Sequence, residues 1–304
     1  MVLRRHLADI TGATRTRVQG WMADGRVSLN GMVVRRAATR ARAGDVVNVV
    51  LPNGAERRPT VAEDLVLDVL YEDEYLLAIN KPPGMVVHPA YRHPTGTLIN
   101  AVCGRARQWP DGRRPSLVGR LDKLTSGVLL VAKTPLVHRE LQSATAMEKV
   151  YLAVVYGRPV ARGTLRFGLT VDPDDRRRVT AVPMGGRACV TRFETLGRVP
   201  AARVGLALLR CELVTGRRHQ IRVHLASRGW PLVGDPLYGA PRWREIADPS
   251  LAAVLQAFPR QALHSWRVTF VHPVTQRTMT VEAPLPADFE PLLAATGLRS
   301  APPV

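Results

Sequence analysis

Several short segments between residues 60 and 290 alternate apolar with polar side chains and are bounded by Gly or Pro. A period of two is typical of β-strands, and Gly or Pro then turns the chain. Helical patterns are fewer: Thr97 can cap a helix through Leu98 and Val102, and two others lie in LVHRELQSATAM and HQIRVHLAS. The mixture predicts an α+β fold with a mixed, largely antiparallel sheet and helices packed on it, not a doubly wound fold. The strand segments are YLLAINKPPG, VYLAVVYG, LALLRCELV and SWRVTFVHP.

Residues 1–58 have a different pattern and predict a small separate α+β domain. Two short helical stretches come first, and in the second of them Val18, Trp21 and Met22 repeat at the spacing of one helix face. Asn30-Gly31 then lies between two β-prone runs. This pair is preferred in a type I′ hairpin turn, because both central residues need positive φ. The run AGDVVNVVLP adds one more strand.

Charge narrows the class of partner. Forty-three Lys and Arg against 25 Asp and Glu give a formal net charge of +18. Such an excess implies a polyanionic partner. Nucleic acid is favoured over a membrane surface, because the chain has no basic amphipathic helix with a bulky aromatic face and no apolar run long enough to cross a bilayer. Only four residues are Lys, and all fall in the stretch richest in motifs: Lys81, Lys123, Lys133 and Lys149.

Four features predict a cytoplasmic protein without a nucleotide or metal cofactor. The N-terminus lacks the apolar stretch of a signal peptide, and three widely separated cysteines suit a reducing compartment. No phosphate-binding glycine motif occurs where a strand meets a helix. His219 and His224 are five residues apart, so they do not share a helix face as a zinc-binding pair would.

The run TRTRVQGWMADGRVSLNGMVV, followed by AGDVV, resembles the S4 RNA-binding domain. In that domain a helix and the following hairpin present arginines to RNA phosphates. The first 58 residues hold eleven arginines against four acidic residues, which suits such a role. A charged but silent solvated face is the alternative. The resemblance implies RNA contacts by Arg15, Arg17, Arg35 and Arg36.

Four later blocks combine glycines, charges and polar residues densely. They are NKPPGMVVHP (80–89), VGRLDKLTSGVLLVAK (118–133), EKVYLAVVYG (148–157) and TGRRHQIRVHLASRGWPLVGDPLYG (215–239). In order, spacing and identity they resemble the RluA-type pseudouridine synthases over residues 60–290. Taken alone, Asp122 in the second block is interpreted first as a turn or capping residue; the resemblance implies that it is the catalytic residue.

The implied reaction cleaves the uridine C1′–N1 bond, rotates the detached uracil and rejoins it through C5, without metal, redox cofactor or nucleotide. A carboxylate near C1′ can serve as a nucleophile or as a base that removes the 2′ proton, and both routes stay open. A glycoside hydrolase would need two carboxylates flanking the bond. Here the motif supplies only Asp122.

The resemblance also assigns the residues around Asp122. Arg222 is its guanidinium partner, which favours the charged carboxylate. Tyr151 stacks on the target base, which must first be extruded from the RNA. Arg120 fills the vacated stack. His219 and Gln220 are expected in the wall of the site, in contact with RNA, whereas Lys81 and residues 234–236 are expected to be scaffold.

One departure is visible at Gly119, where the RluA-type family usually has His. The sister family of small-subunit-type synthases reads GRLD at that point, as this chain does. The other blocks follow the RluA-type pattern, so Gly119 bears on RNA selection near the site more than on the chemistry.

Three segments are therefore predicted: an S4-like RNA-binding domain (1–58), a catalytic domain (59–290) and a C-terminal tail (291–304). The expected protein is a monomer that modifies uridines in large-subunit ribosomal RNA, either free or in an assembling subunit. Transfer RNA is the alternative substrate. Two other classes remain: a noncatalytic RNA-binding or ribosome-assembly factor on the same scaffold, and a hydrolase that removes the base.

Overall fold

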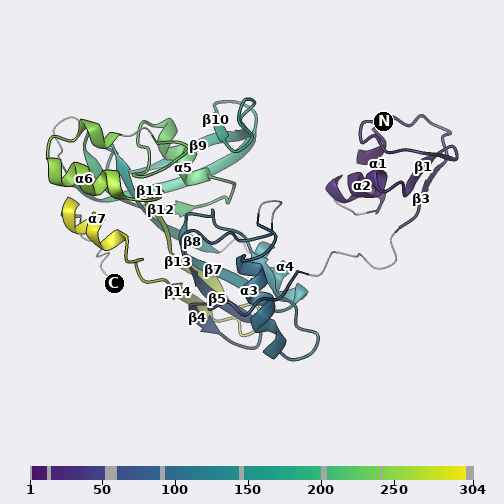
Figure 1. Cartoon of the computed structure of the whole chain (residues 1–304), viewed down its shortest axis with the longest axis horizontal. Helices are drawn as coiled ribbons and strands as arrows, with labels where there is room; N and C mark the ends of the chain where they lie inside the picture. Colours follow the sequence, from purple (N-terminus) through teal and green to yellow (C-terminus); the bar gives the residue numbers. More distant parts are fainter. Residues whose placement is uncertain are drawn as a thin grey trace. The chain divides into compact units, whose positions relative to one another are not determined.

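The computed structural model describes residues 2–11, 15–51, 60–89, 93–143, 147–199, 204–239 and 242–298. They belong to two compact units, Met1–Pro59 and Thr60–Val304 (Figure 1). The predicted boundary after residue 58 falls within residues 52–59, outside the described part of the chain. Within the described ranges, no helix is both long and apolar enough to span a bilayer.

The first unit packs two helices on a small antiparallel sheet, with buried Leu3, Trp21 and Met22 in its core. Its turn is the expected one: Asn30 and Gly31 both have positive φ, 51° and 84°, and the strands on either side pair directly. The elements are α1 (Leu3–Thr11), α2 (Arg15–Ala23), β1 (Val27–Leu29), β2 (Met32–Val33) and β3 (Val47–Val49).

The second unit is built on one 11-stranded sheet, in the order β10-β9-β11-β12-β8-β13-β7-β5-β4, with β14 paired to β13 and β6 to β7. Among the described pairs only β7 with β13 is parallel. The mixed, largely antiparallel α+β fold is confirmed. The strands are β4 (Val69–Glu72), β5 (Leu76–Lys81), β6 (Ser116–Val118), β7 (Ser126–Ala132), β8 (Glu148–Tyr156), β9 (Arg162–Val171), β10 (Val179–Val182), β11 (Arg187–Val199), β12 (Leu206–Leu213), β13 (Leu263–Val271) and β14 (Thr278–Glu282).

Helices cover both faces of this sheet, because the central strands are apolar on both sides. On β8, Tyr151 and Ala153 join the cluster under α3 and α5, whereas Leu152 and Val154 join the cluster under α6 and α7. Helix α4 packs beside the latter face on β5 and β7. Figure 1 shows α6 and α7 well apart from α3 and α4. The helices are α3 (Leu98–Arg105), α4 (Pro135–Ser143), α5 (Gln220–Ser227), α6 (Pro249–Ala257) and α7 (Phe289–Thr296), with 3₁₀ turns at Ala106–Gln108 and Arg242–Glu245.

The C-terminal boundary differs from the expected one. Residues 291–296 continue α7, whose Phe289, Leu292 and Leu293 are buried against α6. Gly297 ends the helix with a φ of 65°. These apolar residues have i, i+3, i+4 spacing, so the segment is an amphipathic helix of the core and the predicted tail begins inside it.

The strands β7 and β13 lie very close together at Gly127. Its register partner is Ser265, and a Cβ at Gly127 would lie 2.1 Å from the Ser265 carbonyl oxygen. Its φ of +107° is also unfavourable for other residues. Glycine is therefore required here, and the close contact fixes the start of β7, directly after the loop that carries Asp122.

Candidate active site

The loop between β6 and β7 carries Asp122, and a buried ammonium holds this loop in place. Lys81, at the end of β5, has no exposed surface, and its Nζ donates to the Lys123 carbonyl at 3.1 Å. It also donates to two carbonyls of the segment after β5, at 2.7 and 3.0 Å. Burial lowers the pKa of Lys81 to about 7. The scaffold role expected for Lys81 agrees with these contacts.

A second buried cation holds the same loop from the other side. Arg260 donates to the Leu124 carbonyl at 3.0 Å and forms a two-bond ion pair with Asp288 at 2.6 and 2.8 Å. Gln261 donates to the Thr125 hydroxyl at 3.2 Å. The position of the Asp122 backbone is thus set by groups from β5 and from the segment before β13. Sequence reasoning missed Arg260, because nothing in its neighbourhood indicates a partner 136 residues away.

Arg222, on α5, links two carboxylates. Its Nη1 donates to Asp122 Oδ2 at 2.9 Å, while Nε and Nη2 each donate to Asp235 at 2.8 Å. Asp235 also accepts from the backbone amides of Leu237 and Tyr238 at 2.9 and 3.0 Å. Burial raises the pKa of Asp235, but the Arg222 hydrogen bonds outweigh it and hold that pKa below its usual range.

The expected pair is therefore a triad with one guanidinium and two carboxylates. The Arg222 side chain is 4% exposed and that of Asp235 is 0% exposed, whereas that of Asp122 is 22% exposed. Asp235 orients Arg222 from behind, and Arg222 presents its remaining donor to the one carboxylate that reaches solvent. Asp235 was expected only as scaffold; its place in the GDPLYG segment was the available signal.

His219 lies on the other side of Asp122, with Nε2 at 3.8 Å from Oδ1. Its Nδ1 is 2.8 Å from the Tyr238 hydroxyl, which also accepts from the Val179 amide. The hydroxyl can therefore donate its own proton to Nδ1, leaving the Nε2 proton facing Asp122. Burial lowers the pKa of His219 to about 4, so the ring is neutral at pH 7.

Gln220 differs from the RNA contact expected of it. Its amide oxygen accepts from the Thr215 hydroxyl and the Arg217 amide at 2.9 and 3.1 Å. Its amide nitrogen donates to the Val190 carbonyl and the Thr191 hydroxyl, both at 3.0 Å. A primary amide has two acceptor and two donor positions, so the protein occupies all of them. Gln220 holds the loop before α5 and has no hydrogen bond left for RNA.

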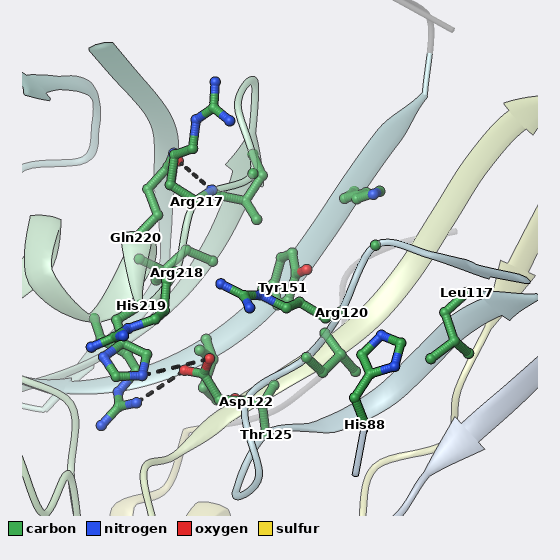
Figure 2. A pocket seen from close by; sticks show the side chains of 18 of the residues that line it. His88, Leu117, Arg120, Asp122, Thr125, Tyr151, Arg217, Arg218, His219 and Gln220 are labelled. Atoms are coloured by element: carbon green, nitrogen blue, oxygen red, sulfur yellow. Dashed lines mark hydrogen bonds and ion pairs between the residues drawn. The ribbon is translucent and has the colours of Figure 1, made fainter. Parts of the chain in front are cut away.

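A cavity of about 450 Å³ is lined by Asp122, His219, Gln220 and Arg222 (Figure 2). Tyr151 reaches it from β8, and its burial raises its pKa to about 12, so the phenol keeps its proton at pH 7. Arg120, two residues after the end of β6 at Val118, is exposed and lines the same cavity. The structure thus brings together the six residues predicted in this unit: Asp122, Tyr151, Arg222, Arg120, His219 and Gln220.

A second cavity, of about 550 Å³, shares Arg120, Arg217 and Arg218 with the first. Arg187, at the start of β11, adds a further guanidinium, and the apolar part of the wall includes Leu169. Three of these arginines were absent from the predicted RNA contacts: Arg187, Arg217 and Arg218. The TGRR run was the available signal for two of them.

The arginines predicted to contact RNA from the first unit have varied environments. Arg36 is exposed. The Arg17 guanidinium lies over the Trp21 ring at 5.5 Å, and Arg35 donates to the Ala23 carbonyl at the end of α2. Arg35 is therefore engaged in ending that helix. Arg15 begins α2, but its side chain lies outside the described part of the structure.

His224 and His264 are fully buried, and burial lowers the pKa of each to about 4 from an ordinary 6.5. Neither ring nitrogen of His224 has a hydrogen-bond partner among the described residues. Within those residues, no three or more His, Cys, Asp or Glu side chains form a group that could hold a metal ion.

The histidines predict acid-sensitive stability. Below pH 6.5 the unfolded chain binds protons that the buried rings do not take up until about pH 4. The stability that the neutral, buried histidines contribute is fully present above pH 6.5. It is lost as the pH falls toward 4, at roughly 1.4 kcal/mol per pH unit for each histidine. Urea unfolding at pH 7.5, 5.5 and 4.5 measures the free energy of unfolding. In His224→Leu this free energy should depend less on pH, by the contribution of one histidine. An equal pH profile in the variant would contradict the prediction.

The chain is similar in sequence to known proteins. The family model for RNA pseudouridylate synthase matches residues 75–227. Ribosomal large subunit pseudouridine synthase D of Pseudomonas aeruginosa is 38% identical over 287 residues, covering 92% of this chain and 87% of that protein. The protein of the same name from Xanthomonas campestris is 40% identical over 288 residues, with 93% and 84% covered. An uncharacterised RNA pseudouridine synthase of Synechocystis is 39% identical over 294 residues, with 92% and 84% covered.

Solved structures share the fold at lower identity. Human RNA pseudouridylate synthase domain containing 4 has a TM-score of 0.59 and 21% identity, covering 76% of this chain and 93% of that chain. Human RNA pseudouridylate synthase domain containing 1 has a TM-score of 0.57 and 23% identity, covering 77% and 89%.

Proposed function

The chain belongs to the RNA pseudouridylate synthase family, and we propose that it isomerises uridines of large-subunit ribosomal RNA with Asp122 as the catalytic carboxylate. Family membership makes it an RNA pseudouridine synthase, an isomerase whose substrate is RNA. The observation that carries the role of Asp122 is its 2.9 Å contact with Arg222 at a cavity that also contains Tyr151.

The chemistry assigned to Asp122 requires an ionised carboxylate that can reach C1′ or the 2′ proton. Arg222 favours that ionised form, because it donates to Oδ2 from a nearly buried position. Oδ1 lies 3.8 Å from Nε2 of the neutral His219, which also lines the cavity. An oxygen in this position can act as nucleophile or as base, and both routes use the same residues.

Tyr151 and Arg120 receive the roles that the family pattern implies. The protonated Tyr151 ring can stack on the extruded base, since an aromatic face accepts any pyrimidine. Arg120 is exposed and adjoins both cavities, so its guanidinium can enter the stack that the uridine leaves. Arg187 and Arg217, both exposed in the second cavity, supply charge for the phosphates beside the target.

The buried position of the second carboxylate, Asp235, argues against removal of the base by hydrolysis. A glycoside hydrolase needs two carboxylates flanking the scissile bond. Asp235 is the second acidic group near Asp122, but its side chain is 0% exposed and it is held by Arg222 and two backbone amides. It cannot activate water in the cavity, so a single reactive carboxylate remains, which suits an isomerisation.

The proposed target follows from the relatives whose names specify large-subunit ribosomal RNA. Transfer RNA remains the alternative substrate, and the monomeric state and cytoplasmic location remain predictions. Transcripts of large-subunit ribosomal RNA and of transfer RNA, labelled with tritium at uridine C5, test the proposal. Release of tritium with pseudouridine in the nucleoside digest of the ribosomal transcript supports it. Product only in transfer RNA overturns the target, abasic sites indicate a hydrolase, and unchanged RNA indicates a binding protein.

The first unit is proposed to bind RNA phosphates, and charge removal tests this. Arg15→Gln, Arg17→Gln and Arg36→Gln together should reduce the slope of log affinity against log salt by about two, because each lost phosphate contact removes roughly 0.7–0.9. Arg35 stays in place, because it donates to the Ala23 carbonyl. Filter binding between 50 and 300 mM salt measures the slope, and the rate at saturating RNA should stay unchanged. An unaltered slope would count against RNA binding by this unit.

A further inference from the structure

Lys149 lines the cavity beside Tyr151, and none of the other three lysines of the chain does so. It lies on β8, two residues before Tyr151. Alternate side chains of a strand project from the same face, so the ammonium and the phenol ring enter the cavity from the same side. A flat base stacked on Tyr151 would therefore have the Lys149 ammonium near its edge.

The ammonium of Lys149 has no partner in the described part of the protein, in contrast with the other buried lysines. Lys81 donates to three carbonyls, and Lys133 pairs with Glu72 and with a carbonyl. No hydrogen bond or ion pair from described residues reaches Lys149, and burial lowers its pKa with no compensating contact. An unpaired, partly buried cation is costly to the folded protein. Such a group at a substrate cavity is expected to find its partner in the substrate.

Gly119 lies next to this ammonium. A Cβ at Gly119 would lie 3.4 Å from Lys149 Nζ, and Gly119 has a φ of +91°. A larger side chain there would compete with the ammonium for the same volume. The Lys149 ammonium thus lies close to the residue that departs from the family pattern, three residues before Asp122.

We propose that Lys149 binds a carbonyl oxygen of the extruded uracil and stabilises the negative charge that the ring carries after the C1′–N1 bond breaks. This inference rests on the proposed function and adds a catalytic residue to it. The electron pair of the broken bond stays on N1, and its charge spreads to the O2 and O4 carbonyls. In the same step C1′ bonds to an Asp122 oxygen, or the 2′ proton passes to that oxygen.

The second half of the reaction returns this charge. C5 bonds to C1′, and Asp122 is released as a carboxylate or gives its proton back to C2′. C5 then loses its proton and N1 gains one, so the product is an isomer of the substrate. The detached ring is an anion in both routes, so the ammonium acts at the same stage whichever route Asp122 follows.

The depth of Lys149 favours the base over a phosphate as its partner. Lys149 is partly buried and also lines a small cavity with apolar side chains, among them Val118, Leu121 and Val268. The cations suited to phosphates, Arg120 and Arg217, are exposed. A backbone phosphate that reached Lys149 would have to leave solvent, whereas an extruded base enters this space in any case.

Lys149→Met tests the proposal, since methionine retains the apolar stem and removes the charge. The single-turnover rate should fall by about 10²- to 10³-fold, as for loss of one donor to a developing anion. The dissociation constant for RNA should stay within about threefold. Removing an unpaired charge should leave the thermal midpoint unchanged or higher, which excludes misfolding. Arg277→Met, which removes an exposed charge in the turn before β14, is the matched control and should keep the wild-type rate.

A transcript with 5-fluorouridine at the target distinguishes a Lys149 that stabilises the uracil anion from one that binds a backbone phosphate. Fluorine withdraws electrons and stabilises the detached ring by itself. The loss of rate caused by Lys149→Met should therefore shrink at least about tenfold on this transcript. The rate is measured as disappearance of 5-fluorouridine from the nucleoside digest. Equal losses with both transcripts, or weaker RNA binding with an unchanged rate, would assign Lys149 to a phosphate and overturn the proposal. An unchanged rate would overturn it too. If the wild-type protein itself forms no pseudouridine, the proposed function fails instead.

Discussion

Asp122→Asn is expected to reduce pseudouridine formation by at least about 10⁴-fold while RNA affinity stays within a few fold of wild type. The amide has the shape of the carboxylate, but it can neither attack C1′ nor accept the 2′ proton. The fold should survive, because Arg222 keeps both bonds to Asp235 and the loop keeps its contacts with Lys81 and Arg260. Affinity should persist, because phosphate contacts supply most of the binding.

Single-turnover tritium release and filter binding, carried out on the same preparations, measure the two effects. Asp111→Asn is the matched control, since Asp111 is an exposed carboxylate outside the cavity residues, and it should retain the wild-type rate. Substantial product from Asp122→Asn would refute the role assigned to Asp122. Loss of RNA binding in that variant would instead assign the carboxylate to the structure of the binding surface.

Arg222→Met is expected to lower the free energy of unfolding by about 3–5 kcal/mol and to abolish turnover. The stability loss arises because Asp235 remains buried with an uncompensated charge. Arg222→Met combined with Asp235→Asn removes that charge while keeping an oxygen for the backbone amides of Leu237 and Tyr238. The double variant should recover most of the stability and remain inactive, because Asp122 still lacks its guanidinium.

Urea unfolding and tritium release of the single and double variants distinguish a structural role of Arg222 from a role in the reaction. A double variant with wild-type turnover would show that Arg222 only neutralises Asp235. A single variant as stable as wild type would contradict the uncompensated charge at Asp235. Recovery of stability without activity is the result that separates the two carboxylates: Asp235 orients, and Asp122 reacts.

Short sequence patterns predicted most of the fold. The β-prone apolar run VYLAVVYG, bounded by Gly, predicted β8, and the Asn30-Gly31 pair predicted the hairpin whose residues have positive φ. Thr97 caps α3 as expected. These predictions hold because the strand period, the turn geometry and the cap each depend on residues close together in the chain. The last helix was missed: Phe289, Leu292 and Leu293 have helical spacing, but residues 291–304 were predicted to be a tail.

The sequence by itself determined the sheet class, the polyanionic character of the partner and, through its resemblance to a family, the residues that gather at one cavity. Only the tertiary structure decided how their charges are distributed. Asp122 and Arg222 are 100 residues apart, and the sharing of Arg222 with Asp235 depends on which donors each carboxylate meets. The satisfied amide of Gln220 and the unpaired ammonium of Lys149 have the same origin. Hydrogen bonding and desolvation are set by neighbours in space, and a residue's type states what it can bind but not what it already holds.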